Sequence, residues 1–199
     1  KRQGLCDTVN QVITTVGLQH QLQHQLEREQ LTRHISQQIH QSLEFDEILK
    51  TTVTEVRQFL QTDRVLVFKL DSARNGTVVA ESVAEDWQSV LYNQIQGACF
   101  TGDYATSYQQ GRVMAKSDIY DGSLTPCHVE FLAQFQVRAN FVVPILRNDH
   151  LWGLLIAHHC SAPRPWQATE TELLQQLAIH LGIALQQATA YAQLEQQSE

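Results

Sequence analysis

Two apolar runs in the second half of the chain constrain the fold more than any other feature. They read ANFVVPIL (139–146) and LWGLLIAHH (151–159), and only the polar residues RNDH lie between them. Runs rich in β-branched and aromatic residues on either side of a short polar turn predict a β-hairpin. The fold class must therefore contain an antiparallel sheet.

Three further strands are predicted upstream of the hairpin. RVLVFKL (64–70) and TVVAESV (77–83) flank the turn signal DSARNG, and RVMAKS (112–117) is a shorter candidate. The region from Glu85 to Gly111 is mixed and loop-rich, which leaves it as an insert of a size that could hold a ligand.

Two amphipathic helices flank the strands. FDEILKTTVTEVRQFL (45–60) carries its apolar residues on one face and is expected to cover the sheet. Residues 168–197 predict a helix of about 30 residues, with Thr169 and Glu172 at the spacing of a capping box. The predicted class is α+β, with one antiparallel sheet, helices on one face and the insert on the other.

The first 43 residues are Gln-rich and contain no proline, which predicts a long helix. Its apolar residues form one narrow stripe: Leu22, Leu26, Leu31, Ile35, Ile39 and Leu43. Such a stripe needs a partner, either a parallel helix from a second copy or the chain's own domain. The expected organisation is an N-terminal linker helix (1–43), a folded domain (44–187) and a C-terminal linker helix (188–199), as a segment of a longer protein.

The charge pattern excludes several classes of function. The net charge of −7, without a basic run, argues against a nucleic-acid surface or contact with an anionic membrane. No stretch approaches the roughly 18 apolar residues of a membrane span, and no signal peptide opens the chain. A cytoplasmic, reducing location is expected, with free thiols at Cys6, Cys99, Cys127 and Cys160.

The segment LTPCH places a cysteine and a histidine at the start of a helix. Thr125 is a good N-cap and Pro126 suits the first helical position, so Cys127 and His128 fall in the first turn. We expect Val129, Leu132 and Phe135 on the buried face. A helix N-terminus favours a thiolate and a ligand that carries carboxylates. Cys127 is therefore either a reactive residue for covalent attachment or an inert small residue.

Two other interpretations of this segment are disfavoured. A Cys-His hydrolase needs a base within reach of the thiol and a third, orienting group, whereas an adjacent histidine on a helix points elsewhere. A metal site would draw on Cys127, His128, His158, His159 and Cys160. Neighbouring strand residues face opposite sides, so HHC cannot converge on one ion without distortion. One of the two adjacent histidines is instead expected to face a pocket.

Three segments together resemble the GAF domain of a cyanobacteriochrome, a bilin-binding photosensory relative of the phytochromes. They are EVRQFLQTDRVLVFKL, LTPCHVEFLAQFQVRANFVVPIL and LWGLLIAHHCSAPRPWQ, within a resemblance that covers about residues 43–190. It implies a GAF fold with a bilin pocket on the sheet face opposite the helices. The expected chromophore is phycocyanobilin, or else phycoviolobilin or biliverdin. A non-pigmented GAF module that binds another small ligand or only dimerises is the alternative, and a cysteine-dependent enzyme is a third class.

The resemblance also implies roles for individual residues. Cys127 would form a thioether with the A-ring side chain, and His128 would pack against the chromophore near its pyrrole nitrogens. Tyr108 falls where the family contacts a propionate, while His158 and His159 lie on the strand that approaches ring D. Light would isomerise the double bond next to ring D and bias the flanking helices, without enzymatic turnover. A parallel homodimer and an output domain, such as a histidine kinase or a chemotaxis-type module, are the implied partners.

One motif departs from the family. Many members carry Asp-Xaa-Cys-Phe before the chromophore cysteine, whereas this chain has Gly97 in the place of the aspartate, followed by Cys99 and Phe100. Asp103 or Asp121 are candidates to replace the missing carboxylate. Cys99 is either a second, reversible link to the bilin or a packed thiol.

The tryptophans have more ordinary roles. Trp87, in the insert, is a further candidate chromophore contact, while Trp152 and Trp166 are expected in the core.

Overall fold

The computed structural model describes residues 17–33, 45–71, 75–95 and 103–197. The chain divides into two units, Lys1–His34 and Ile35–Glu199. In the first unit, residues 17–33 form a helix, as predicted, and the exposed Leu18, Leu22 and Leu26 follow one another at four-residue spacing. The rest of the predicted N-terminal helix lies outside the described residues.

The second unit is built on one antiparallel sheet with the strand order β3-β2-β1-β6-β5-β4. The strands are β1 (Arg64–Leu70), β2 (Gly76–Val83), β3 (Gln94–Ile95), β4 (Met114–Lys116), β5 (Ala139–Arg147) and β6 (His150–His159). The five predicted strands are confirmed. Two elements were not predicted: the short β3, which pairs with β2, and the helix α3 (Asp103–Gln109). Both lie in the region that was expected to be a loop-rich insert.

The β5–β6 hairpin fixes the centre of the sheet. Its turn residues Asn148 and Asp149 have φ angles of 49° and 62°. Asparagine and aspartate tolerate this left-handed region best among residues with a side chain, and a positive φ at both central positions suits the twist of the flanking strands. The predicted hairpin is confirmed.

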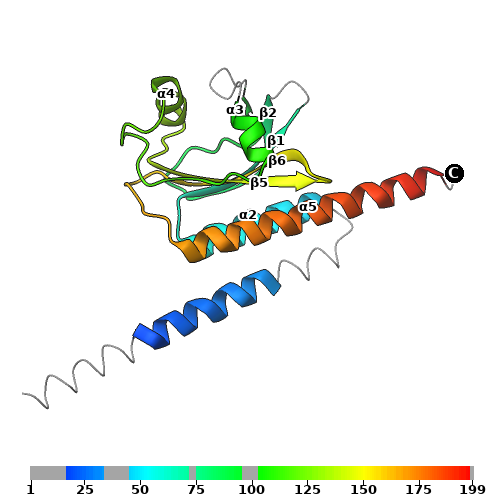
Figure 1. The fold of residues 1–199 in the computed structure, drawn as a ribbon, viewed down its shortest axis with the longest axis horizontal. Coiled ribbons are helices and arrows are strands. Elements are labelled where there is room, and N and C mark those ends of the chain that lie inside the picture. The colour runs from blue at the N-terminus through cyan, green and yellow to red at the C-terminus, as the bar shows by residue number, and fades with distance from the viewer. Residues whose placement is uncertain (1–16, 34–44, 72–74, 96–102, 198–199) are drawn as a thin grey trace, which may run out of the picture. The chain divides into compact units, whose positions relative to one another are not determined.

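Two helices cover one face of the sheet, α2 (Phe45–Leu60) and α5 (Ala168–Gln197) (Figure 1). Both have the bounds that the apolar pattern predicted. The predicted stripe of α5 is buried: Leu174, Leu177, Leu181 and Leu185. The predicted capping box, Thr169 with Glu172, is wrong by two residues, because the backbone N–H of Gln167 donates to the carboxylate of Glu170 at 2.8 Å. Glu170 therefore closes the first turn, since the helix starts at Ala168.

The opposite face of the sheet carries α3 and α4 (Pro126–Gln134) (Figure 1). Strand alternation sends odd-numbered residues of β1, such as Val65 and Val67, into the core under α2 and α5. Leu66 and Phe68 point to the other side, into an apolar cluster with Met114 and Val142. The predicted layering, with helices on one face and a ligand-sized insert on the other, is confirmed.

Candidate ligand-binding site

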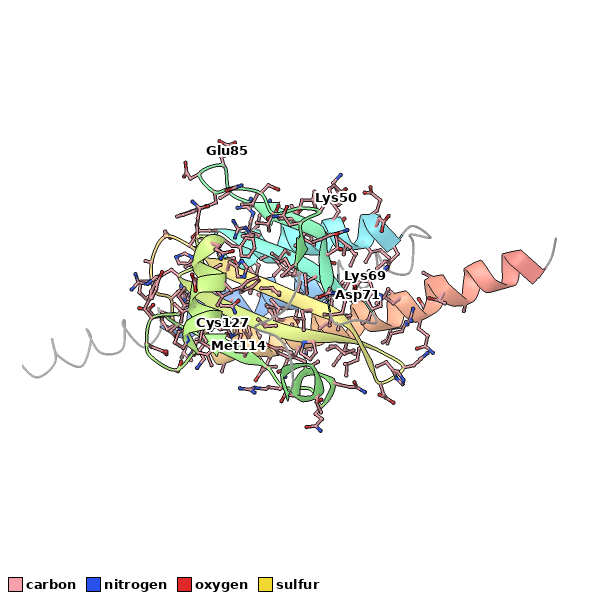
Figure 2. All side chains as sticks on the ribbon, turned by 90° about the horizontal axis from the view of Figure 1, so that it is seen from above. Lys50, Lys69, Asp71, Glu85, Met114 and Cys127 are labelled. Atoms are coloured by element: carbon pink, nitrogen blue, oxygen red, sulfur yellow. The ribbon has the colours of Figure 1, made fainter. Side chains whose placement is uncertain are left out.

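The start of α4 forms as the sequence predicts. Thr125 is the N-cap with an extended backbone, its hydroxyl accepts from the backbone N–H of His128 at 3.3 Å, and Pro126 opens the helix. Cys127 and His128 consequently occupy the first turn. In Figure 2, which views the sheet from the side of α3 and α4, Cys127 lies on α4.

Cys127 has an exposed side chain and is disulfide-bonded. Cys160 is the free cysteine of the described part of the chain. The expectation of free thiols is therefore met by Cys160 and not by Cys127. A disulfide forms where a second sulfur lies within bonding geometry, and a reducing compartment would keep such a pair as thiols.

His128 points toward the sheet and is only 1% exposed. Burial lowers the pKa of His128 below its ordinary value, which favours the neutral imidazole. Of the predicted buried face, only Leu132 is fully buried, whereas Val129 and Phe135 are half-buried. The buried face is rotated from the predicted one because His128 and Leu132, one turn apart, are the residues that meet the sheet.

A cavity lies between α4 and the sheet. Its volume is about 50 Å³, smaller than the roughly 300–1,000 Å³ of typical small-molecule sites. The strands contribute a largely apolar floor of Leu66, Phe68, Val142, Leu154 and Ile156. The polar lining consists of Tyr108, His128, Asn140 and His158. An apolar cavity with a few convergent polar groups is typical of a binding site, and one this small must widen to admit a large ligand.

Tyr108 and His158, two of the residues singled out in the sequence, thus reach the cavity with His128. Tyr108 lies on α3, is buried, and its hydroxyl is 3.9 Å from the sulfur of Met114. His158 is 6% exposed. Burial, together with the positive charge of Arg64, lowers the pKa of His158 to about 3. His158 therefore stays neutral at physiological pH.

His159 does not reach the cavity. It points to the other side of β6, where its Nδ1 is 3.5 Å from the carboxylate of Asp63 and its Nε2 is 3.1 Å from the hydroxyl of Ser161. Because neighbouring residues of a strand face opposite sides, His158 faces the cavity and His159 does not. This agrees with the expectation that one of the two adjacent histidines would face a pocket. The position of His159 therefore does not support the contact with a chromophore that the resemblance implied for it.

The remaining candidates are less directly placed. Trp87 is half-buried and is not among the residues that line the cavity. Asp121 is exposed and accepts from the backbone N–H of Ser123 at 2.8 Å, so it is not in the cavity either. Asp103 is the first residue of α3. Gly97, Cys99 and Phe100 lie outside the described residues.

Arg64 and Asn140 are the residues that sequence reasoning missed. Arg64 is fully buried, and its guanidinium donates to the carbonyls of Phe135 at 2.9 Å and Gln88 at 2.6 Å. Its Nε lies 3.2 Å from the carboxylate of Glu81. The sequence did carry a signal for both residues: each is a polar residue at the start of an apolar strand, in DRVLVFKL and RANFVV. A polar residue is buried in such a place only when it has hydrogen-bond or ionic partners.

Two other features bear on the class of site. Within the described ranges, no three His, Cys, Asp or Glu side chains are grouped so that they could hold a metal ion. None of the described helices is both long enough and apolar enough to cross a membrane.

The GAF domain family model matches residues 44–185. Two curated relatives are a protein of Synechocystis named as a methyl-accepting chemotaxis protein and the circadian input-output histidine kinase CikA of Thermosynechococcus vestitus. The first is 36% identical over 97% of this chain and the second 37% over 96%. The chain spans only 20% and 27% of the lengths of these two relatives.

Solved structures agree with this assignment. The blue-light-absorbing form of the PixJ GAF domain from Thermosynechococcus elongatus is 40% identical, with a TM-score of 0.73 over 77% of this chain and 91% of that one. A phycocyanobilin-bound GAF domain from a cyanobacterial phytochrome is 31% identical, with a TM-score of 0.77 over 82% and 96%.

The chain therefore belongs to the GAF domain family. Within that family it is similar to the GAF domains of cyanobacteriochromes, which include a PixJ domain 41% identical to this chain, so the resemblance seen in the sequence is confirmed.

Proposed function

We propose that this chain is a photosensory module that binds a linear tetrapyrrole covalently through Cys127 and photoconverts reversibly by isomerisation of the double bond next to ring D. The observation that carries this proposal is the position of α4. Its first turn presents Cys127 at the surface and puts the next residue, His128, into the wall of an apolar cavity. Structural neighbours at 40% and 31% identity are cyanobacterial photosensory GAF domains, the second with phycocyanobilin bound.

The residues of this chain fit the chemistry of attachment. Once an external thiol reductant has reduced the disulfide, the Cys127 thiol would add to the double bond of the A-ring side chain, so that one C–S bond forms, the C=C π bond is lost and the thiol proton passes to the neighbouring carbon. The positive end of α4 favours the thiolate that makes this addition. The bilin supplies the absorption of visible light. Phycocyanobilin is the chromophore that we favour, ahead of phycoviolobilin and biliverdin.

The cavity walls provide the remaining requirements of a bilin site. Leu66 and Phe68 of β1 exclude water from one side, and the neutral His128 and His158 offer ring nitrogens without adding a buried charge. Tyr108 offers a hydroxyl for a propionate. Because the cavity is about 50 Å³, binding must also displace apolar side chains of the wall outward.

A signal can leave the site through the sheet. β5 and β6 carry Asn140 and His158 on the cavity side, while α5 packs against β5 on the other side. A change in the contacts of ring D would therefore shift the strands on which α5 rests and bias that helix. We propose that the linker helices pair in a parallel homodimer. They would pass the change to a cytoplasmic output domain, of the histidine kinase or chemotaxis type.

The second candidate function is a non-pigmented GAF module that only dimerises. The small cavity and the disulfide at Cys127 favour it. To separate the two, the chain is produced with phycocyanobilin, and absorption is recorded before and after illumination and again after denaturation. A reversible visible change, with colour that survives denaturation and is lost in Cys127→Ala, is expected. Cys160→Ala is the matched control and should remain coloured. A wild-type chain that is colourless with both phycocyanobilin and biliverdin would contradict the photosensory function and favour the module that only dimerises.

A further inference from the structure

We propose that Asp118 and Arg138 are positioning residues, which hold the entrance to α4 so that Cys127 stands at the cavity for covalent attachment. This inference rests on the proposed function, because it concerns the reaction at Cys127. Neither Asp118 nor Arg138 is among the residues that line the cavity, so both act through the loop that precedes α4.

α4 has little packing of its own to fix the end that carries Cys127. Only two of its nine residues are fully buried. Its far end is tied to β1, because the guanidinium of Arg64 donates to the carbonyl of Phe135 at 2.9 Å. The chain enters the near end through residues 117–125, so the conformation of this loop decides where the first turn of α4 lies.

Asp118 and Arg138 join the two ends of the segment that contains α4. Nε and Nη2 of Arg138 donate to the two carboxylate oxygens of Asp118, at 2.9 and 2.8 Å. The main chain adds a second tie, because the N–H of Ile119 donates to the carbonyl of Arg138 at 2.9 Å. The N–H of Arg138 donates in turn to the carbonyl of His159 in β6, also at 2.9 Å. The entrance loop is thus fastened to the exit of α4 and, through it, to the sheet.

The ion pair fixes geometry more than it adds stability. The side chains of Asp118 and Arg138 are 26% and 39% exposed, and such partly exposed ion pairs contribute little to the free energy of unfolding. A guanidinium that meets both oxygens of one carboxylate, however, fixes the angle between the two groups as well as their distance. Cζ of Arg138 also lies 5.0 Å from the centre of the Tyr120 ring. The hydrogen bonds from Arg138, together with one from the N–H of Tyr120, keep the pKa of Asp118 below its ordinary value, so the pair stays charged at neutral pH.

The same pair borders the small apolar cluster on which α4 packs. This cluster contains Ile119 of the entrance loop, Leu132 of α4 and Val137 of the exit, all buried. Asp118 precedes Ile119 in the chain, and Arg138 follows Val137. The ion pair therefore holds together the two chain segments against which Leu132 packs.

Further hydrogen bonds continue the constraint from the ion pair to the first turn of α4. The N–H of Ser123 donates to the carboxylate of Asp121 at 2.8 Å, and Nζ of Lys116 donates to the hydroxyl of Ser123 at 2.7 Å. Two residues later, Thr125 caps the helix. None of these contacts involves the Cys127 sulfur, so they persist when the disulfide is reduced.

The position of Cys127 matters because the sulfur and a carbon of the A-ring side chain must first approach to roughly 3–3.5 Å. A misplacement of about 1 Å in such a geometry costs about 100-fold in rate. Without the ion pair, the first turn of α4 would occupy several positions, and only some of them would bring the sulfur to the cavity. We therefore expect slower bond formation with little loss of bilin binding, because the cavity lining stays in place.

A nitroxide spin label on Cys127 measures the position of the first turn without any pigment. The label is attached to the reduced, ¹⁵N-labelled chain carrying Cys6→Ser and Cys99→Ser, in which the remaining Cys160 is buried. NMR then records how strongly the label broadens each backbone amide of β5 and β6.

The broadening pattern should depend on the ion pair. In Arg138→Gln we expect the broadening to spread over more amides and to weaken at those most affected in the wild type. Arg147→Gln replaces an exposed arginine at the end of β5, and this control should keep the wild-type pattern. Because the pair is partly exposed, Arg138→Gln should unfold thermally within about 4 °C of the wild type.

Attachment kinetics give the second readout. The reduced chain is mixed with phycocyanobilin at several concentrations, and the colour that survives denaturation is followed over time. In Arg138→Gln the limiting rate should fall about tenfold, while the half-saturating bilin concentration should change by less than about twofold. Asp118→Asn should behave in the same way, and the double variant should be no slower than either single one. Arg138→Lys keeps the charge but cannot bond both oxygens, so it should recover only part of the rate.

Alkylation of reduced Cys127 by iodoacetamide separates the position of the thiol from its reactivity. Since Cys127 is exposed, Arg138→Gln should be alkylated at the wild-type rate. A parallel fall in alkylation would show that the pair acts on the chemistry of the thiol and would overturn the positioning role. A higher half-saturating concentration with an unchanged limiting rate would overturn it too, because the pair would then serve bilin binding.

An unchanged label pattern in Arg138→Gln would also overturn the inference. If the wild-type chain attaches no bilin, the proposed function fails, and the label pattern still decides whether the pair positions Cys127. If Arg138→Gln does not fold, Asp118→Asn, which preserves the size of the side chain, takes its place in both measurements.

Discussion

Arg64 and Glu81 form a buried ion pair between β1 and β2, with Nε and Oε1 3.2 Å apart and side chains 0% and 2% exposed. The carboxylate also accepts from the backbone N–H groups of Val90 and Leu91, at 3.0 and 3.1 Å. The guanidinium reaches the carbonyl of Phe135 at the end of α4. One charged pair thus ties two strands, the loop after β2 and the helix that carries Cys127.

Glu81→Gln tests how much this ion pair contributes to the stability of the domain. It leaves the Arg64 charge buried without its counter-ion, so we expect a loss of about 3–5 kcal/mol in the free energy of unfolding, measured by urea denaturation. The control is Glu85→Gln, on the exposed loop labelled in Figure 2, which should change stability by no more than about 0.5 kcal/mol. Similar stabilities for the two variants would mean that the pair does not stabilise the domain.

Gly182 allows α5 to lie against β5. A Cβ at this position would overlap the backbone oxygen of Leu146, which cannot move without shifting the strand. Gly182→Ala is therefore expected to destabilise the domain by about 1–3 kcal/mol, although alanine normally improves a helix. Gly17→Ala is the matched control, because nothing lies within 4 Å of its added Cβ. Thermal unfolding of both variants would reveal the opposite signs, and an equally stable Gly182→Ala would contradict the close packing.

The bounds of an element could be predicted from the sequence where its apolar pattern lies within its own residues. α2 and β1 have the predicted bounds because a helical stripe and an apolar run are legible within their own residues. β3 was missed since two residues carry no pattern of their own and become a strand only by pairing with β2. Arg64 was missed for a similar reason. Its partners Glu81, Gln88 and Phe135 are remote in sequence, and only the fold decides whether a charged strand residue is buried or exposed.

Thr125 holds the first turn of α4. Thr125→Ala removes the oxygen that accepts from the N–H of His128, and it should cost about 1 kcal/mol of stability. Because the same turn positions Cys127, covalent attachment of phycocyanobilin should also slow, as measured by the colour that survives denaturation over time. Thr125→Ser keeps the capping oxygen and should restore both values. Loss of stability with unchanged attachment would separate the cap from the positioning of Cys127.

The two described cysteines should differ in reactivity once the protein is reduced. Burial raises the pKa of the Cys160 thiol to about 11, so at pH 8 it remains protonated and poorly nucleophilic. Cys127 is exposed at a helix N-terminus. Brief treatment with iodoacetamide at pH 8, followed by peptide mass spectrometry, should label Cys127 well before Cys160. Labelling of Cys160 at an equal rate would contradict its burial.

The low pKa of His158 makes the stability of the domain depend on pH. The folded ring takes up a proton only near pH 3, whereas the unfolded ring does so near its ordinary pKa of 6.5. Between these values the unfolded state binds the extra proton, so stability is fully present above about pH 6.5 and is lost as the pH falls toward 3. The contribution of this one group approaches about 1.4 kcal/mol per pH unit in that window.

Urea unfolding at pH 7, 6, 5 and 4 measures this slope. His158→Gln removes the titrating ring, and we expect its stability to fall less steeply with pH than that of the wild type. The lowered pKa of His128, caused by burial, adds to the slope with the same sign and should persist in His158→Gln. His24→Gln, in the separate helix 17–33 and with a side chain 59% exposed, is the control and should leave the wild-type slope unchanged. If His158→Gln had the wild-type slope, burial and the charge of Arg64 would not be keeping His158 neutral in the folded state.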